Sequence, residues 1–133
     1  MVPIALDRDF LHQVLRNLIV NAIKYRRKVT CEVIVSVDEI KGREMTFLRI
    51  QVKDKGIGIK PEDQVHIFEK FFRSETARKQ NTEGIGLGLY VAKMILDQAG
   101  GSISFKSEEG VGTVFTILIP KTGMSLQERE LFE

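Results

Sequence analysis

Three glycines alternate at positions 84, 86 and 88, and an apolar pattern of helical spacing follows them directly. Glycine lacks a Cβ and adopts positive φ readily, so this backbone can turn tightly and approach a ligand closely. The helical pattern is carried by Leu87, Val91, Met94, Ile95 and Ala99. A glycine loop that leads into a helix N-terminus directs free N–H groups at an anion, which makes a phosphate seat one interpretation. A purely structural glycine turn fits the glycines alone about equally well.

The glycine spacing differs from two common nucleotide-binding motifs. The dinucleotide fingerprint Gly-x-Gly-x-x-Gly would need a glycine where this chain has Leu89. No Gly-x-x-x-x-Gly-Lys-Ser/Thr run occurs anywhere in the chain. Other parts of the sequence must therefore decide between a ligand loop and a structural turn.

Length and composition predict one soluble globular domain of 133 residues with a substantial core. The net charge of +2 gives no support for a nucleic-acid partner. A single cysteine, Cys31, excludes an internal disulfide and fits a reducing compartment. No apolar run approaches the roughly 18 residues of a membrane span.

The longest predicted helix follows Asp7, a suitable N-cap, and runs to about Tyr25. One apolar face defines it, formed by Phe10, Leu11, Val14, Leu15, Leu18, Ile19 and Ala22. Asn17 and Asn21 lie four residues apart and so share a face, with Lys24 following one turn later. Asparagine is a poor helix former, so two at this spacing indicate a specific role.

Four segments alternate or are rich in β-formers and predict strands: Thr30–Val37, Phe47–Lys53, Ser102–Lys106 and Thr113–Ile119. Residues 1–6 form a further candidate edge strand, and residues 38–45 are predicted to be a hairpin loop. These strands alternate with helices and hairpins, which predicts one mixed or antiparallel sheet covered by helices.

Two further segments complete the chain. Pro61 opens a predicted short helix. The polar, aperiodic residues 73–83 predict a lid or binding loop. Residues 1–120 are expected to form the domain, and residues 121–133 a charged C-terminal tail.

Five segments, in order along the chain, together resemble the motifs of histidine kinases. Asn17–Tyr25 resembles their N box, Asp54–Gly58 their first glycine box, Phe68–Phe72 their F box, and Gly84–Gly88 and Gly112–Phe115 their later glycine boxes. The chain thus resembles the catalytic, ATP-binding domain of a two-component sensor histidine kinase. Its superfamily includes DNA gyrase, mismatch-repair and heat-shock chaperone ATPases. The resemblance implies the Bergerat fold, an α/β (α+β) two-layer sandwich whose mixed, mostly antiparallel sheet packs on helices.

The same resemblance implies roles for individual residues. Asp54 would accept a hydrogen bond from the exocyclic amine of adenine, and an ionised carboxylate is suited to this because it only accepts. Asn17 and Asn21 would contact Mg²⁺ and phosphate, with Lys24 as a third catalytic residue. Further nucleotide contacts fall on Tyr25, Gly56, Gly58, Ile59, Phe72, Arg73, Gly84, Gly86, Leu87, Gly88, Leu89 and Thr113. Gly58 would leave room for the base, and Thr113 would contact it through water.

Each motif also has a plainer interpretation. Asp54 could cap a turn, because Asp is common beside Gly in turns. The two asparagines could be a satisfied polar pair, and Phe68, Phe71 and Phe72 are expected first of all to be core residues. The basic side chains at 26, 27 and 28 fit a solvated helix end, which the helix dipole favours.

The resemblance implies a phosphoryl donor to a histidine outside this chain. Neither His12 nor His66 lies in a phosphoacceptor motif, and both are expected to be structural or surface residues. The expected partners are a dimerisation domain that would precede residue 1 and a response regulator, with no nucleic acid and no direct membrane contact. The missing acceptor and Met1 suggest an excised domain, and a cytoplasmic location is expected.

Two alternatives of other classes remain open. A self-sufficient ATPase of the gyrase type would carry a general-base Glu at the position of Asn17, and an amide is no base at neutral pH. A nucleotide-free docking module would not need its glycine boxes, since glycine in such loops costs backbone entropy.

Overall fold

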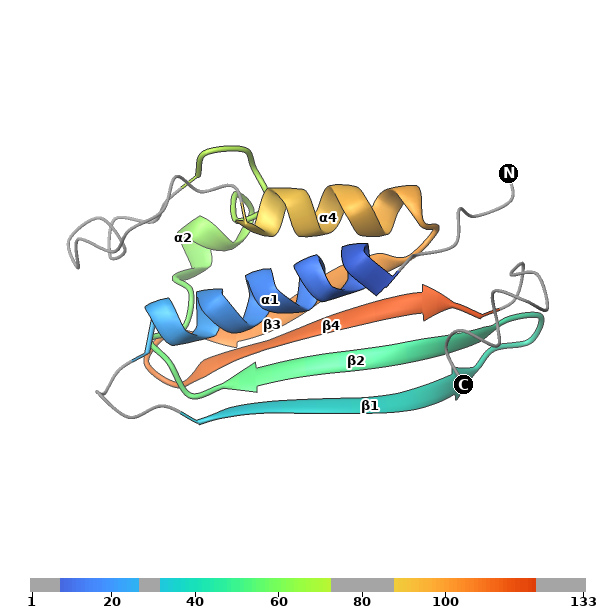
Figure 1. Cartoon of the computed structure of the whole chain (residues 1–133). Coiled ribbons are helices and arrows are strands. Elements are labelled where there is room, and N and C mark those ends of the chain that lie inside the picture. The colour runs from blue at the N-terminus through green and yellow to red at the C-terminus, as the bar shows by residue number, and fades with distance from the viewer. Residues whose placement is uncertain (1–7, 27–31, 73–87, 122–133) are drawn as a thin grey trace.

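The structure is a computed structural model, and it describes residues 8–26, 32–72 and 88–121 (Figure 1). Its elements, in chain order, are α1 (Arg8–Lys24), β1 (Val33–Lys41), β2 (Thr46–Asp54), α2 (Pro61–Gln64), α4 (Gly88–Gln98), β3 (Ser102–Glu108) and β4 (Gly112–Pro120). Several predictions lie outside these ranges, namely the edge strand at 1–6, the cap at Asp7, the loop at 73–83 and the tail from residue 122.

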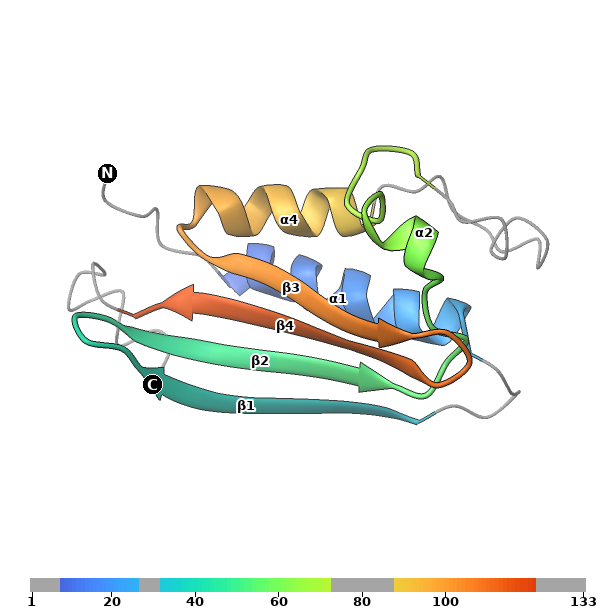
Figure 2. The same cartoon turned by 180° about the vertical axis from the view of Figure 1, so that it is seen from behind.

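The described strands form one sheet in the order β1-β2-β4-β3. Every pairing between neighbouring strands is antiparallel. Helices α1 and α4 lie side by side on one face of this sheet, and the opposite face carries no described helix (Figures 1 and 2). This arrangement confirms the predicted two-layer sandwich of helices on a mostly antiparallel sheet.

The core lies between the helices and the covered face of the sheet. Residues directly opposite each other on antiparallel strands form rows across the sheet. Two apolar rows fill the middle of this face: Ile50, Ile117 and Ile103, then Val52, Phe115 and Phe105. The helices contribute Val14 and Leu18 from α1 and Leu96 from α4, all fully buried. Alternation along the strands therefore gives the buried layer that the sequence pattern indicated.

Helix α4 is followed by two glycines, Gly100 and Gly101, that form its C-terminal cap. Gly100 has φ 75°, and its N–H donates to Asp97 O at 3.2 Å. The N–H of Gly101 donates to Leu96 O at 2.8 Å. These two bonds form a Schellman motif, which satisfies carbonyls that a helix end otherwise leaves unpaired.

The first hairpin differs from its prediction. Strand β1 continues to Lys41, whereas residues 38–45 were expected to be loop, because its pairing with β2 persists to the Lys41–Thr46 pair. Val37 is 60% exposed although it lies opposite the buried Ile50. The reason is that β1 is the outermost described strand on this side of the sheet, and of its side chains only Val33, at its start, packs against the core (Figure 1).

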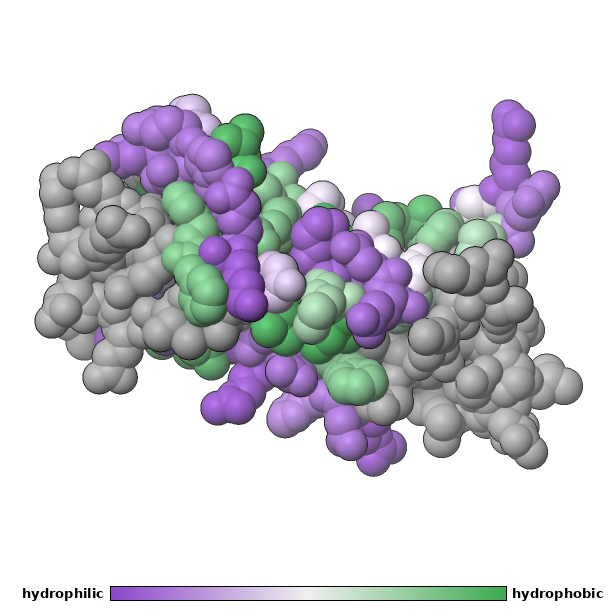
Figure 3. Space-filling view, turned by 90° about the horizontal axis from the view of Figure 1, so that it is seen from above, coloured by the Kyte–Doolittle hydropathy of each residue, from purple (hydrophilic) through white to green (hydrophobic). Residues whose placement is uncertain are grey.

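The surface of the helical layer mixes polar and apolar side chains (Figure 3). The exposed apolar side chains of α1 and α4 are Phe10, Val20, Ile23 and Met94. Phe10, which was expected on the apolar face of α1, is thus half-exposed near the start of the helix. No helix in the described ranges is both long and apolar enough to cross a membrane.

Candidate functional site

A row of polar residues ends the apolar core at one end of the sheet. Asp54 on β2 lies opposite Thr113 on β4, and Thr113 lies opposite Ser107 on β3. Side chains alternate along a strand, so these three share the helix-covered face with Val52 and Phe115, two residues further in. Register thus places a carboxylate and two hydroxyls side by side at the edge of the core.

Asp54 is half-buried and is held by backbone amides. The N–H of Gly56 donates to its Oδ1 at 2.8 Å. Burial raises the pKa of Asp54, and hydrogen bonds from the backbone N–H groups of Gly56 and Thr113 act in the opposite direction. Within the described residues Asp54 forms no ion pair. Its carboxylate, which has more acceptor positions than these two donors use, is therefore available to a ligand donor.

Ser107 joins the loop after β2 to the end of the sheet. Its Oγ accepts from Ile59 N at 2.8 Å, lies 2.8 Å from Thr113 Oγ1 and donates to Gly112 O at 3.1 Å. Gln64 adds bonds to Ile59 O and to Ser107 O, at 3.1 and 3.3 Å. The sequence-based site omitted Ser107, although its inward position two residues after Phe105 was a usable signal.

Two glycines of the first glycine box are required by close backbone contacts. A Cβ on Gly56 would lie 2.7 Å from Tyr25 O and 2.9 Å from Asp54 Oδ1. Gly58 has φ 72°, and a Cβ there would lie 2.1 Å from Glu108 O. These contacts bring the loop 54–59 close to the end of α1 and to the turn between β3 and β4, so the loop is fixed on two sides.

The N-box helix meets the start of α4. Asn17 Nδ2 donates to Gly88 O at 3.1 Å, which joins residues 71 positions apart. This bond uses the amide nitrogen and leaves the Asn17 carbonyl oxygen as an acceptor. In the described part of the chain, the side chain of Asn21 forms no hydrogen bond. Both amides of the predicted metal pair therefore keep oxygen atoms for a ligand.

The end of α1 contains the remaining N-box residues. Lys24 is exposed, and Tyr25 is partly buried. The carbonyl of Tyr25 accepts from Ile57 N at 3.1 Å, which ties the helix end to the glycine loop. Arg26 Nη1 donates to Ile23 O at 2.8 Å, as expected of a basic residue at a helix C-terminus.

The F box divides between the core and the surface. Phe68 packs edge-on against Phe105 with ring centroids 5.8 Å apart, and Phe72 also packs against the core. Phe71 was expected in the core, and this expectation is wrong, because its side chain is 58% exposed. Its φ of 65° turns the backbone there, and Lys70 Nζ lies 5.2 Å from the Phe71 ring centroid.

Both histidines are on the surface, as predicted. His12 is exposed on α1. His66 Nδ1 lies 2.8 Å from Glu69 Oε1, and its ring packs against Phe72 at 5.6 Å. In the described ranges, His, Cys, Asp and Glu side chains form no group of three that could hold a metal ion.

A known protein family matches nearly the whole chain. Residues 6–123 match the model of the family described as histidine kinase-, DNA gyrase B- and HSP90-like ATPase. The chain belongs to this family. The matched range includes all five motifs and the polar row at the end of the sheet.

The individual relatives are named as sensor proteins or histidine kinases. The chain is 42% identical over 115 residues to the sensor protein SrrB of Staphylococcus aureus, covering 86% of this chain but only 19% of that protein. A mycobacterial sensor histidine kinase, MprB, has a similar structure, with a TM-score of 0.70 and 27% identity over 86% of this chain and 72% of that one. The catalytic domain of histidine kinase ThkA gives a TM-score of 0.69 and 31% identity, over 86% and 69%.

A further solved structure contains a nucleotide analogue. Full-length ShkA in complex with AMPPNP matches with a TM-score of 0.69 and 29% identity, over 84% of this chain and 21% of ShkA. This chain is thus similar to the catalytic domain of sensor histidine kinases and spans a small part of its full-length relatives.

The structure brings most predicted site residues into two groups. Asp54, Gly56, Gly58, Ile59 and Thr113 surround the polar row, with Tyr25 in contact through its backbone. Asn17 and Gly88 meet at the start of α4, next to Leu89. Arg73, Gly84, Gly86 and Leu87 lie outside the described residues.

Proposed function

We propose that this chain binds ATP with Mg²⁺ and donates the γ-phosphoryl group to a histidine of a separate dimerisation domain in two-component signalling. The observation that carries this proposal is the half-buried carboxylate of Asp54, held by backbone N–H groups and without an ion-pair partner among the described residues. We take residues 1–120 as the catalytic domain and residues 121–133 as a tail.

The chemistry of the polar row fits an adenine base. Asp54 offers acceptors for the 6-amino group, since an ionised carboxylate only accepts. Gly56 keeps the carboxylate oxygen free of a side chain that would otherwise lie 2.9 Å away. Tyr25, Ile59 and Phe72, all partly buried, supply apolar surface near the loop. Adenine recognition is therefore assigned to this end of the sheet.

The phosphate chain is assigned to the start of α4 and to the N box. Helix α4 starts at Gly88, and the positive end of its dipole there would favour a bound anion. Gly84, Gly86, Leu87, Leu89 and Arg73 would complete this seat. Asn17 and Asn21 offer neutral oxygens suited to Mg²⁺, which when bound neutralises charge on the phosphates. Lys24 adds a positive charge from the exposed end of α1.

The proposed reaction demands positioning more than covalent chemistry from the protein. Asn17 occupies the position where hydrolysing relatives would need a base, and its amide cannot accept a proton at neutral pH. The proposal therefore favours transfer to an external histidine over hydrolysis. The dimerisation domain, the response regulator and a cytoplasmic location belong to the proposal for the whole protein.

The test measures phosphoryl transfer from ATP with this chain and the dimerisation domain supplied as two separate proteins. With radiolabelled ATP the chain alone should gain essentially no acid-labile label, because His12 and His66 are surface residues without acceptor surroundings. Added as a second chain, the cognate dimerisation domain should become labelled slowly, since no tether raises its effective concentration. Stable label on His12 or His66 would contradict the proposal, and failure to bind fluorescent ATP would favour a docking module.

The metal assignment has its own test in Asn21→Ala. Loss of the amide oxygen should shrink the increase in ATP affinity that Mg²⁺ gives, while adenosine affinity without metal stays unchanged. Titration calorimetry with and without Mg²⁺ measures both. Gln13→Ala, which removes an exposed amide elsewhere on α1, is the matched control. Equal weakening of ATP and adenosine would show that Asn21 is structural.

A further inference from the structure

The hydroxyl of Ser107 has more close contacts than it has protons. Its three polar neighbours are Ile59 N at 2.8 Å, Thr113 Oγ1 at 2.8 Å and Gly112 O at 3.1 Å. A serine hydroxyl has one proton to donate and two lone pairs to accept. The contacts of Ser107 therefore constrain which partner donates in each bond.

Only one arrangement of protons makes all three contacts hydrogen bonds. The Ile59 N–H can only donate, and the Gly112 carbonyl can only accept, so the single Ser107 proton points at Gly112 O. The remaining contact then requires Thr113 to donate to Ser107. If Ser107 donated to Thr113 instead, two oxygens without a proton between them would face each other at 3.1 Å. Such an unmade bond at a partly buried site is costly.

This arrangement fixes the polarity of Thr113. Its side chain is buried, with 6% of the residue exposed, so water does not reorient the hydroxyl freely. With its proton committed to Ser107, Thr113 Oγ1 presents only lone pairs to a ligand. Asp54, the neighbour of Thr113 in the same row, likewise presents acceptors. The site therefore offers acceptors from two adjacent strands.

We infer that Ser107 is a positioning residue that holds the Thr113 hydroxyl as an acceptor and so favours a 6-amino purine over a 6-oxo purine. This inference rests on the proposed binding of adenine beside Asp54. A 6-amino group donates to acceptors, whereas a 6-oxo group places a third acceptor against them. Removing Ser107 frees the Thr113 proton to turn towards the base, and the site then tolerates the 6-oxo group.

The test compares ADP with inosine diphosphate, which has a 6-oxo group in place of the 6-amino group. Titration calorimetry on Ser107→Ala should show the ratio of the two affinities falling by about fivefold, the value of one ordinary hydrogen bond. Ser104→Ala is the matched control, because Ser104 lies exposed on the same strand. Its ratio should equal that of the wild type. Equal weakening of both nucleotides by Ser107→Ala would overturn the inference, because a purely structural role loosens the site without changing selectivity.

A double-mutant cycle tests whether Ser107 acts through Thr113. Thr113→Val removes the hydroxyl at nearly constant volume, so adding Ser107→Ala should not change the affinity ratio further. An additional change in the ratio would overturn the inference. If Ser107→Ala fails to fold, Ser107→Cys replaces it, because its thiol keeps a weak donor. Ser107→Cys should then lower the affinity ratio less than Thr113→Val does. A wild-type affinity ratio in both Ser107→Cys and Thr113→Val would again overturn the inference. Absence of ADP binding in the wild type would instead remove the proposed function itself, so the two failures are distinguishable.

Discussion

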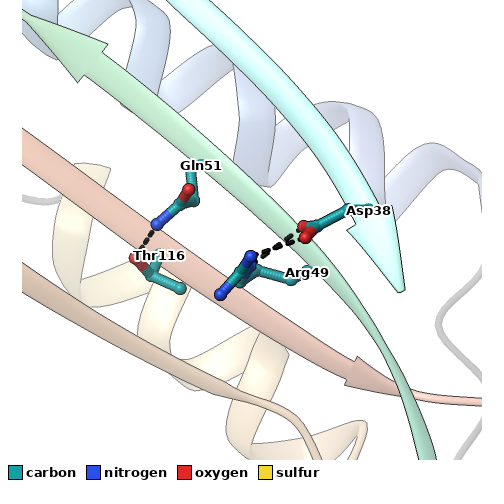
Figure 4. A network of polar contacts seen from close by, with 4 residues as sticks. All are labelled: Asp38, Arg49, Gln51 and Thr116. Carbon is teal, nitrogen blue, oxygen red and sulfur yellow. Dashed lines mark hydrogen bonds and ion pairs between the residues drawn. The ribbon is translucent and has the colours of Figure 1, made fainter. Parts of the chain in front are cut away.

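Two aspartates on neighbouring strands of one sheet are held in opposite ways. Asp38 on β1 lies opposite Arg49 on β2, on the face away from the helices, and Arg49 Nε donates to its Oδ1 at 2.9 Å (Figure 4). The hydrogen bond from Arg49 lowers the pKa of Asp38. Beside this pair, Gln51 Nε2 donates to Thr116 Oγ1 at 3.2 Å. The middle of the open face thus carries two pairs of mutually satisfied polar side chains.

Asp54, at the end of β2, has no such cation among the residues that the structure describes. Its described partners are backbone N–H groups, and burial raises its pKa. A carboxylate paired with arginine has its charge neutralised by the protein, whereas one fixed by two amides keeps charge and acceptor capacity for a ligand. The comparison shows that the position of Asp54 at the end of the core, with no guanidinium from the described ranges beside it, makes it a candidate binding residue.

The largest expected difference between the two aspartates is in nucleotide affinity. Asp54→Asn should weaken ADP binding by about 2 kcal/mol or more, roughly thirtyfold, because the amide places a donor against the adenine amine. Asp38→Asn should leave the affinity unchanged. Titration calorimetry on both variants, with circular dichroism to confirm folding, decides the matter. Unchanged binding in Asp54→Asn would contradict the adenine assignment.

A second variant fills the space beside Asp54 and leaves its charge in place. Gly56→Ala would place a Cβ 2.7 Å from Tyr25 O and should cost about 1–3 kcal/mol of folding stability, with weaker ADP binding. Gly110→Ala is the control, since a Cβ there has no neighbour within 4 Å and its φ of 81° costs only about 1–2 kcal/mol. Urea denaturation and ADP titration report the two effects. Equal ADP affinity in the two variants would show that the glycine loop does not set the site.

The opposite pKa shifts predict opposite dependences of stability on pH. The raised pKa of Asp54 means that its carboxyl binds a proton more tightly in the folded state than in the unfolded state. The contribution of Asp54 to folding stability therefore falls as the pH rises above the unfolded pKa of about 3.9. Asp54→Asn should therefore gain stability relative to wild type as the pH rises from about 3.9 through the raised pKa of the folded state. The lowered pKa of Asp38 makes its contribution present above about pH 3.9 and lost below it. Urea denaturation at several pH values measures both, and parallel curves for the two variants would refute the difference.

The smallest expected effect is on the open face. Asp38→Asn should reduce stability only slightly at low salt, because exposed ion pairs contribute little and are screened. At high salt the difference from wild type should vanish. Thermal unfolding at low and high ionic strength measures this, and a large, salt-independent loss would show that the pair is structurally essential.

The sequence predicted the architecture well where periodicity was strong. The stripe from Val14 to Ala22 predicted α1, and the alternation of Leu48, Ile50 and Val52 predicted the buried face of β2. It predicted less where exposure depends on neighbours. Phe71 was expected in the core because it is aromatic, but the backbone turn at its positive φ leaves it at the surface.

Sequence alone determined that Asp54 ends a buried strand and precedes glycines, and that Asn17 and Asn21 share a helix face, because these relations are local. Only the tertiary structure placed Ser107 beside Thr113 and Thr113 beside Asp54, since strand order and register join residues far apart in the chain. It alone also separated Asp38, paired with Arg49, from Asp54. The local sequence pattern predicts which residue types lie at a site. The direction of a hydrogen bond depends instead on which groups tertiary packing brings within about 3 Å of each other.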